Sequence, residues 1–237
     1  MKKIIGLVLM LVTMTAAAQK DVTKFLGIPV DGYKTEMKKQ LIAKGFTYDS
    51  ENNAFLGEFN GRDVNVFIGT NNNKVWRIMV CDANMSNETD IKIRFNKLCD
   101  QFTRNKKYMP VNFGEKDFTI SESEDISYEM LVNKKRYEAA FYQLPDPEMM
   151  DLLMKQDTFK KRINDALLLE YTQEQIDNPT EKQAEDMKRI SSKEISRITY
   201  DIMVKKTVWF MINDNYGKYY ISIFYDNEYN HSDGEDL

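Results

Sequence analysis

Apolar residues recur along the chain with the two periods that distinguish helices from strands, and this pattern predicts the elements one by one. In the segment 33–44, Met37, Leu41 and Ile42 fall on one side and lysines on the other. This is the spacing of an amphipathic helix. Gly45 follows, and glycine commonly ends helices because it adopts the left-handed conformation. The pattern therefore predicts a helix that ends near residue 44.

Three segments with a two-residue alternation come next and predict an antiparallel meander. Asn60-Gly61 joins the first two, and this dipeptide favours the tight turn of a β-hairpin. In the third segment, Trp76, Ile78 and Val80 are expected to share one face of the sheet. The predicted strands are 54–59, 62–69 and 74–81.

A second helix is predicted after the meander, because Ser86 or Asn87 can cap a segment that runs to about Arg104. Its apolar residues recur at helical spacing and are expected to pack on the meander; they are Ile91, Phe95, Leu98 and Phe102, with Cys99 beside them. Residues 19–110 would then form a compact half with the order α-β-β-β-α.

Residues 111–237 again mix strand and helix patterns. Pro145-Asp146-Pro147 predicts the start of a helix that continues to residue 171, with a break near Asp157. The polar stretch 172–193 is expected to be exposed helix or mobile loop, and the tail from residue 227 to be frayed. Alternation predicts strands at 126–130, 136–144, 198–204, 208–212 and 219–225, although isoleucines 195, 198 and 202 would also suit a helix.

These elements together predict an α+β fold, in which antiparallel meanders carry helices mainly on one face. The length after residue 18 suits a single domain, 19–237, built of the two halves 19–110 and 111–237.

The N-terminus has the layout of a cleavable signal peptide. Lys2 and Lys3 precede an apolar run at 4–14, which is too short to span a bilayer as a helix, and Ala18 ends a small-residue site. We expect cleavage after Ala18 and a periplasmic or secreted product. No cysteine follows the apolar run, so a lipoprotein anchor is not expected.

Charge and hydropathy narrow the choice of partners. Residues 1–18 carry two lysines and no acid, so their removal takes the formal charge from −4 to −6. A mildly acidic protein has no electrostatic attraction to nucleic acid or anionic lipid. No later stretch is apolar enough to cross a membrane, so no membrane insertion is expected after cleavage.

Cys81 and Cys99 are the only cysteines of the chain. In an oxidising compartment they invite a disulfide, which would tie the second helix to the third strand of the meander. Two buried thiols are the alternative, because free cysteine is among the most buried residue types.

Catalytic groups are sparse. The single histidine, His231, lies in the acidic tail, and no phosphate loop or dinucleotide fingerprint is present. Paired carboxylates are the remaining possibility; the candidates are Glu58 with Asp63 and Glu129 with Glu138 on facing strands. Such acids are usually only solvated, so we expect no enzyme, no metal and no cofactor.

Aromatic residues are concentrated in the last strands. If helices cover one face of the sheet only, Trp209 and Tyr220 could lie on the other face and bind a peptide or stack on a sugar. The alternative is ordinary packing, since aromatic residues are common in strands.

Several stretches of the chain resemble uncharacterised secreted proteins of Bacteroidetes-type gut anaerobes. They are 25–32 (FLGIPVDG), 57–64 (GEFNGRDV), 216–221 (YGKYYI) and the terminal 230–237. The resemblance implies a cell-envelope setting and no particular chemistry. The layout of helix and meander is also similar to small periplasmic modules that bind proteins, including inhibitor-like and outer-membrane assembly domains, which is an analogy of fold alone.

The leading hypothesis is a non-catalytic binding module for an envelope protein, peptide or glycan. The alternatives are an envelope hydrolase that uses paired carboxylates and a purely structural envelope protein.

Overall fold

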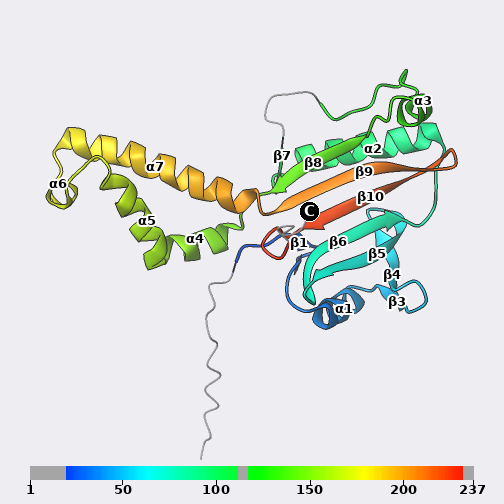
Figure 1. Cartoon of the computed structure of the whole chain (residues 1–237), viewed down its shortest axis with the longest axis horizontal. Helices are drawn as coiled ribbons and strands as arrows, with labels where there is room; N and C mark the ends of the chain where they lie inside the picture. Colours follow the sequence, from blue (N-terminus) through cyan, green and yellow to red (C-terminus); the bar gives the residue numbers. More distant parts are fainter. Residues whose placement is uncertain (1–19, 112–116, 232–237) are drawn as a thin grey trace, which may run out of the picture.

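A computed structural model describes residues 20–111 and 117–231, which form an eight-stranded antiparallel sheet, a two-stranded hairpin and seven helices (Figure 1). The predicted α+β class is confirmed. The predicted signal peptide, 1–18, lies outside the described residues.

The strands are β1 Lys24–Phe25, β2 Ile28–Pro29, β3 Thr47–Asp49, β4 Ala54–Phe59, β5 Arg62–Asn71, β6 Lys74–Asp82, β7 Tyr108–Pro110, β8 Glu138–Gln143, β9 Thr207–Asn215 and β10 Lys218–Asp226. The helices are α1 Lys34–Ala43, α2 Glu88–Arg104, α3 Ile126–Leu131, α4 Pro147–Lys155, α5 Asp157–Leu167, α6 Gln173–Asp177 and α7 Glu181–Met203.

The large sheet consists of two four-stranded meanders. Its strand order is β3-β4-β5-β6-β10-β9-β8-β7, so β6 of the first meander pairs with β10 of the second, with Val80 opposite Ile223. The predicted strands 54–59, 62–69 and 74–81 are confirmed as β4, β5 and β6. Asn60 and Gly61 both have positive φ, 54° and 71°, as the predicted type I′ turn requires.

Both α1 and α2 cover the same face of the sheet. Met37 and Leu41 of α1 and Phe95 and Leu98 of α2 are buried in one core with the inward-facing residues of the strands. However, α2 packs chiefly on β10, β9 and β7 of the second meander, and not on the meander that precedes it. An apolar stripe shows that a helix is buried but cannot specify which strands it covers.

A buried ion pair fixes α2 across the junction of the two meanders. Arg94 of α2 donates from Nε to Asp82 Oδ2 at 2.7 Å, and its second guanidinium nitrogen bonds the other carboxylate oxygen. The side chains are only 7% and 3% exposed. Asp82 ends β6 and also accepts from the amide of Ile221 in β10, at 3.2 Å. One carboxylate therefore links α2, β6 and β10.

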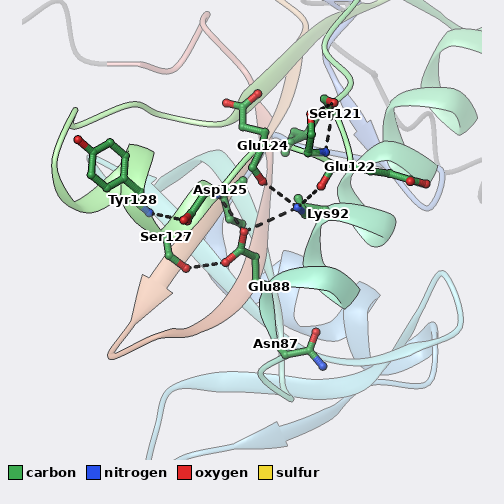
Figure 2. Close-up of polar contacts among 12 residues, drawn as sticks. Asn87, Glu88, Lys92, Ser121, Glu122, Glu124, Asp125, Ser127 and Tyr128 are labelled. Atoms are coloured by element: carbon green, nitrogen blue, oxygen red, sulfur yellow. Dashed lines mark hydrogen bonds and ion pairs between the residues drawn. The ribbon is translucent and has the colours of Figure 1, made fainter.

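Residues 126–130 form helix α3 and not the predicted strand. Asp125 caps the helix by accepting from the amide of Tyr128 at 2.8 Å. Figure 2 shows that Glu88, in the first turn of α2, accepts from the hydroxyl of Ser127, and Glu88 also accepts from the amide of Ile126 at 3.0 Å. Lys92 donates to the carbonyls of residues 122 and 124, at 2.9 and 2.8 Å. Glu88 therefore satisfies the first amide of α3, Asp125 satisfies that of Tyr128, and Lys92 ties the preceding segment to α2, so that this short sequence forms a helix.

Helices α4 to α7 form an arm that extends from one end of the sheet, between the adjacent strands β8 and β9 (Figure 1). The predicted start is confirmed, with Asp146 as the N-cap and Pro147 in the first turn. The predicted break near Asp157 is also present, at Gln156. The segment 198–203 belongs to α7, so the predicted strand there is wrong and the helical spacing of the isoleucines is the correct interpretation.

The first part of the predicted frayed tail is anchored to the sheet. Asn227 is fully buried; its amide donates to the carbonyl of Trp76 at 2.7 Å and its side chain to the carbonyl of Val30 at 2.7 Å. Asn230 donates to the carbonyl of Val75 at 2.8 Å. These contacts hold residues 227 and 230 against the sheet, and the rest of the predicted frayed tail, 232–237, lies outside the described residues. None of the helices in the described part of the chain is long and apolar enough to span a membrane.

Candidate functional site: the open face of the sheet

The face of the sheet opposite α1 and α2, which we call the open face, carries a central row of apolar side chains. Strand register places five residues directly beside one another across five strands. They are Phe67 of β5, Met79 of β6, Phe224 of β10, Trp209 of β9 and Ala140 of β8. Four of the five are half-buried, and Phe224 is 9% exposed. Neighbouring strands are about 4.8 Å apart, so the row is roughly 19 Å wide.

A more polar row borders the apolar row on one side. Cys81, Ser222 and Met211 lie opposite one another in β6, β10 and β9, and Asn65 and Glu138 continue the row on β5 and β8. Ser222 is hydrogen-bonded on the open face, because its Oγ lies 3.2 Å from Cys81 Sγ and accepts at 3.0 Å from the side chain of Asn213, which is opposite Tyr220 in the next row. An apolar centre with a polar border is the usual anatomy of a protein interface.

A β-bulge shapes the other border. Ile78 pairs with Ile68 and Arg77 with Gly69, but the next pair is Val75 with Thr70, so Trp76 is an extra residue in β6. Val75 is fully buried, whereas Trp76 and Arg77 are both half-buried side by side. The prediction that Trp76 shares a face with Ile78 and Val80 is therefore wrong, because the extra residue reverses the alternation beyond this point.

Gly69 makes room for the bulge. A Cβ atom at this position would lie 3.2 Å from Arg77 Cβ and 3.5 Å from the indole nitrogen of Trp76. The absence of a side chain at Gly69 therefore lets the two bulged side chains lie over β5.

Arg77 is held on the open face by a carboxylate and three aromatic rings. Its Nε and a terminal nitrogen both bond Asp226, at 2.6 Å each, and Trp209 donates to the same carboxylate at 2.9 Å. The guanidinium carbon lies 4.2 Å from the centre of the Trp76 ring, 4.9 Å from that of Phe224 and 5.5 Å from that of Trp209. Such contacts stabilise a cation on an aromatic surface and fix its position.

Trp209 and Tyr220, the aromatic residues predicted for an uncovered face, both lie on the open face and are half-buried. Trp209 stacks on Phe224 with ring centres 4.1 Å apart and an angle of 16° between the planes. The pattern gave no reason to single out Phe67, Met79 or Arg77. The only sequence signal that could have identified them is that they alternate with the core residues of β5 and β6.

The predicted disulfide between Cys81 and Cys99 is not formed. Cys81 lies on the open face beside Ser222, whereas Cys99 is buried in the core on α2, on the opposite side of the sheet. Burial raises the pKa of the Cys99 thiol to about 12 and also raises the pKa of the Cys81 thiol. Both side chains are free thiols.

The structure brings together one of the two predicted carboxylate pairs and separates the other. Glu58 and Asp63 are opposite each other at the end of the β4–β5 hairpin, where both are exposed. Glu129 lies on α3, so the prediction that it faces Glu138 across two strands is wrong. His231 stands edge-on to the Trp76 ring, at 4.7 Å between ring centres, and not beside a thiol. Within residues 20–111 and 117–231, no three histidine, cysteine or acidic side chains are placed to hold a metal ion.

The molecule is thus an α+β protein with two joined meanders, one helix-covered face and one open face of aromatic and apolar side chains. Comparisons with models of protein families, with curated proteins and with solved structures found no match. The functional argument therefore depends on the geometry of the open face.

Proposed function

We propose that the protein is a non-catalytic, extracytoplasmic binding module whose open face docks against a partner protein. The observation that supports this proposal most is the registered row of Phe67, Met79, Phe224 and Trp209, bordered by Arg77 and by a polar row. Tryptophan, tyrosine and arginine are the residues that contribute most to protein interfaces, and methionine adapts to the shape of a partner. The extracytoplasmic setting follows from the predicted signal peptide.

The width of the row favours a protein over a glycan among the partners considered. The row is about 19 Å wide and crosses five strands, and a flat surface of this width suits a protein partner better than a single sugar ring. A sugar needs an uncovered ring face and free polar groups beside it. Trp209 instead stacks on Phe224, and its indole N–H already donates to Asp226.

An affinity experiment tests the proposal. The protein, the variant Met79→Lys/Tyr220→Asp and the control Tyr128→Ser are used as bait with an envelope extract from the producing cells. Tyr128 is an exposed residue of α3, outside the open face. We expect one protein to be captured by the wild type and the control and lost with the double variant. Equal capture by all three baits, with the folds verified by circular dichroism, would refute binding through the open face.

A further inference from the structure

A cavity of about 1190 Å³ opens on the helix-covered side, away from the open face. Its walls come from the tip of the β1–β2 hairpin, the end of β4, the last turns of α2 and the linker between β8 and α4. The apolar part of the wall includes Leu26, Phe59, Leu98, Phe102 and Tyr225. The volume exceeds the roughly 300–1,000 Å³ of common small-molecule sites, so an extended molecule fits it better than a single ring.

The charge of the cavity is opposite to that of the protein. Four lysines line it, against the two acids Glu58 and Asp146, although the whole chain has a formal charge of −4. The paired lysines are Lys24, whose Nζ lies 2.6 Å from Asp146, and Lys206, whose Nζ lies 2.8 Å from the buried Asp21. Even with Asp21 included, the surroundings keep one excess positive charge. Lys106 and Lys107 are exposed and have no ion-pair partner among the residues that the structure describes.

Tyr225 brings an unused hydrogen-bond donor to the cavity. Its side chain lines the cavity and is only 4% exposed, with its ring 5.0 Å from that of Phe25. Within residues 20–111 and 117–231 its hydroxyl has no hydrogen-bond partner, and burial raises the pKa of this phenol well above its ordinary value. The hydroxyl is therefore a free donor at the cavity wall, where an oxygen of a bound ligand can accept from it.

Leu26 gives independent support at the mouth of the cavity. It has φ 51° in the tight turn Leu26-Gly27, a left-handed position where asparagine or glycine is common and leucine is strained. Its side chain is nevertheless 40% exposed, at the edge of the cavity. The strained backbone therefore presents an apolar side chain to the entrance.

We propose that this cavity binds an amphiphilic carboxylate, with an acyl chain along the apolar wall and the carboxylate bonded by the Tyr225 hydroxyl and attracted by the lysines. The site is independent of the proposed function, because its residues lie on the helix-covered side and the partner surface is the open face. A loss of binding in one site therefore leaves the other unaffected.

Calorimetric titration with dodecanoate, below its aggregation concentration, tests the proposal on the full chain lacking residues 1–18. We expect saturable binding of one dodecanoate, weaker binding of dodecanol and none of dodecyltrimethylammonium. Tyr225→Phe removes only the hydroxyl; it should weaken dodecanoate binding roughly tenfold or more and leave the ligand-free melting temperature unchanged or higher. Tyr220→Phe, on the same strand but on the open face, is its matched control and should bind as the wild type does.

Leu26→Asn provides a second variant whose two effects have opposite signs. Asparagine tolerates the left-handed conformation, so the ligand-free melting temperature should rise, while the lost apolar contact weakens dodecanoate binding. Its control is Tyr216→Asn, because Tyr216 also has a left-handed φ, 52°, but is fully exposed at the β9–β10 turn, away from the cavity. This control should gain stability and keep its affinity.

Three results would overturn the proposal. The first is the absence of saturable dodecanoate binding to the wild type. The second is unchanged affinity in both Tyr225→Phe and Leu26→Asn. The third is binding of an acidic apolar peptide without any binding of dodecanoate, which would assign the cavity to a peptide.

Discussion

The Arg94–Asp82 pair gives the sharpest prediction about stability. Asp82→Asn removes the negative charge while keeping an oxygen that can accept from the amide of Ile221, and it leaves a guanidinium that is 7% exposed without its counter-charge. Removing one member of a buried pair costs about 3–5 kcal/mol. Arg94→Met leaves the carboxylate unpaired and should cost a similar amount. The double variant should recover most of the loss, because both charges are then absent from the core.

Urea unfolding followed by circular dichroism measures these effects. With a slope of about 2–3 kcal/mol per molar urea, each single variant should lower the midpoint by roughly 1–2.5 M. The loss in the free energy of unfolding of the double variant should be smaller than the sum of the two single losses, by at least about 2 kcal/mol. Single effects below about 1 kcal/mol, or additive effects in the double variant, would show that the pair is not the buried link between α2, β6 and β10.

Three further predictions concern individual side chains. Thiol labelling of the native protein after non-reducing purification should find two free thiols, with Cys81 modified well before Cys99, whose pKa is raised to about 12; a disulfide would contradict the structure. Hydrogen bonds from Lys135 and Tyr137 lower the pKa of Glu124 below its ordinary value of 4.5. The ionised carboxylate therefore stabilises the fold above pH 4.5, and this contribution is lost as the pH falls through the lowered pKa. Stability measured from pH 6 to pH 3 should therefore decline less steeply in Glu124→Gln, and an identical decline would refute the effect. Gly57→Ala should cost about 1–3 kcal/mol in thermal unfolding, because its Cβ would lie 2.5 Å from the buried ring of Phe46; an unchanged melting temperature would show that the ring moves freely.

Local sequence patterns were sufficient to predict the elements where strands are long and turn residues are distinctive. The first meander follows from two-residue alternation and from Asn60-Gly61, and the arm begins where Asp146 and Pro147 predict it. The pattern was ambiguous in the segment 198–203, where the isoleucines suit both periods and helix α7 simply continues.

Tertiary contacts decided the elements that the sequence could not predict. Residues 126–130 alternate as a strand would, but Glu88 of α2 accepts from the first amide of the segment and stabilises a helix instead. The apolar stripe of α2 likewise does not predict that this helix packs on the second meander.

The candidate site was predictable only in part, for similar reasons. Trp209 and Tyr220 follow from strand alternation once helices cover a single face. Trp76 lies on a different face from the predicted one because of a β-bulge, and no residue of its own segment predicts this bulge. Arg77 and Asp226 are 149 residues apart in the chain and meet only because β6 pairs with β10.

Site-specific photo-cross-linking in the producing cells tests the central claim most directly. A photoreactive phenylalanine analogue is introduced singly at Phe67, Met79 or Tyr220 on the open face, and at the exposed control positions Ile42 and Tyr128. The open-face account predicts one cross-linked partner protein of constant mass from the first three positions and none from the controls. Cross-links confined to the control positions, or no partner at any open-face position in folded protein, would contradict it.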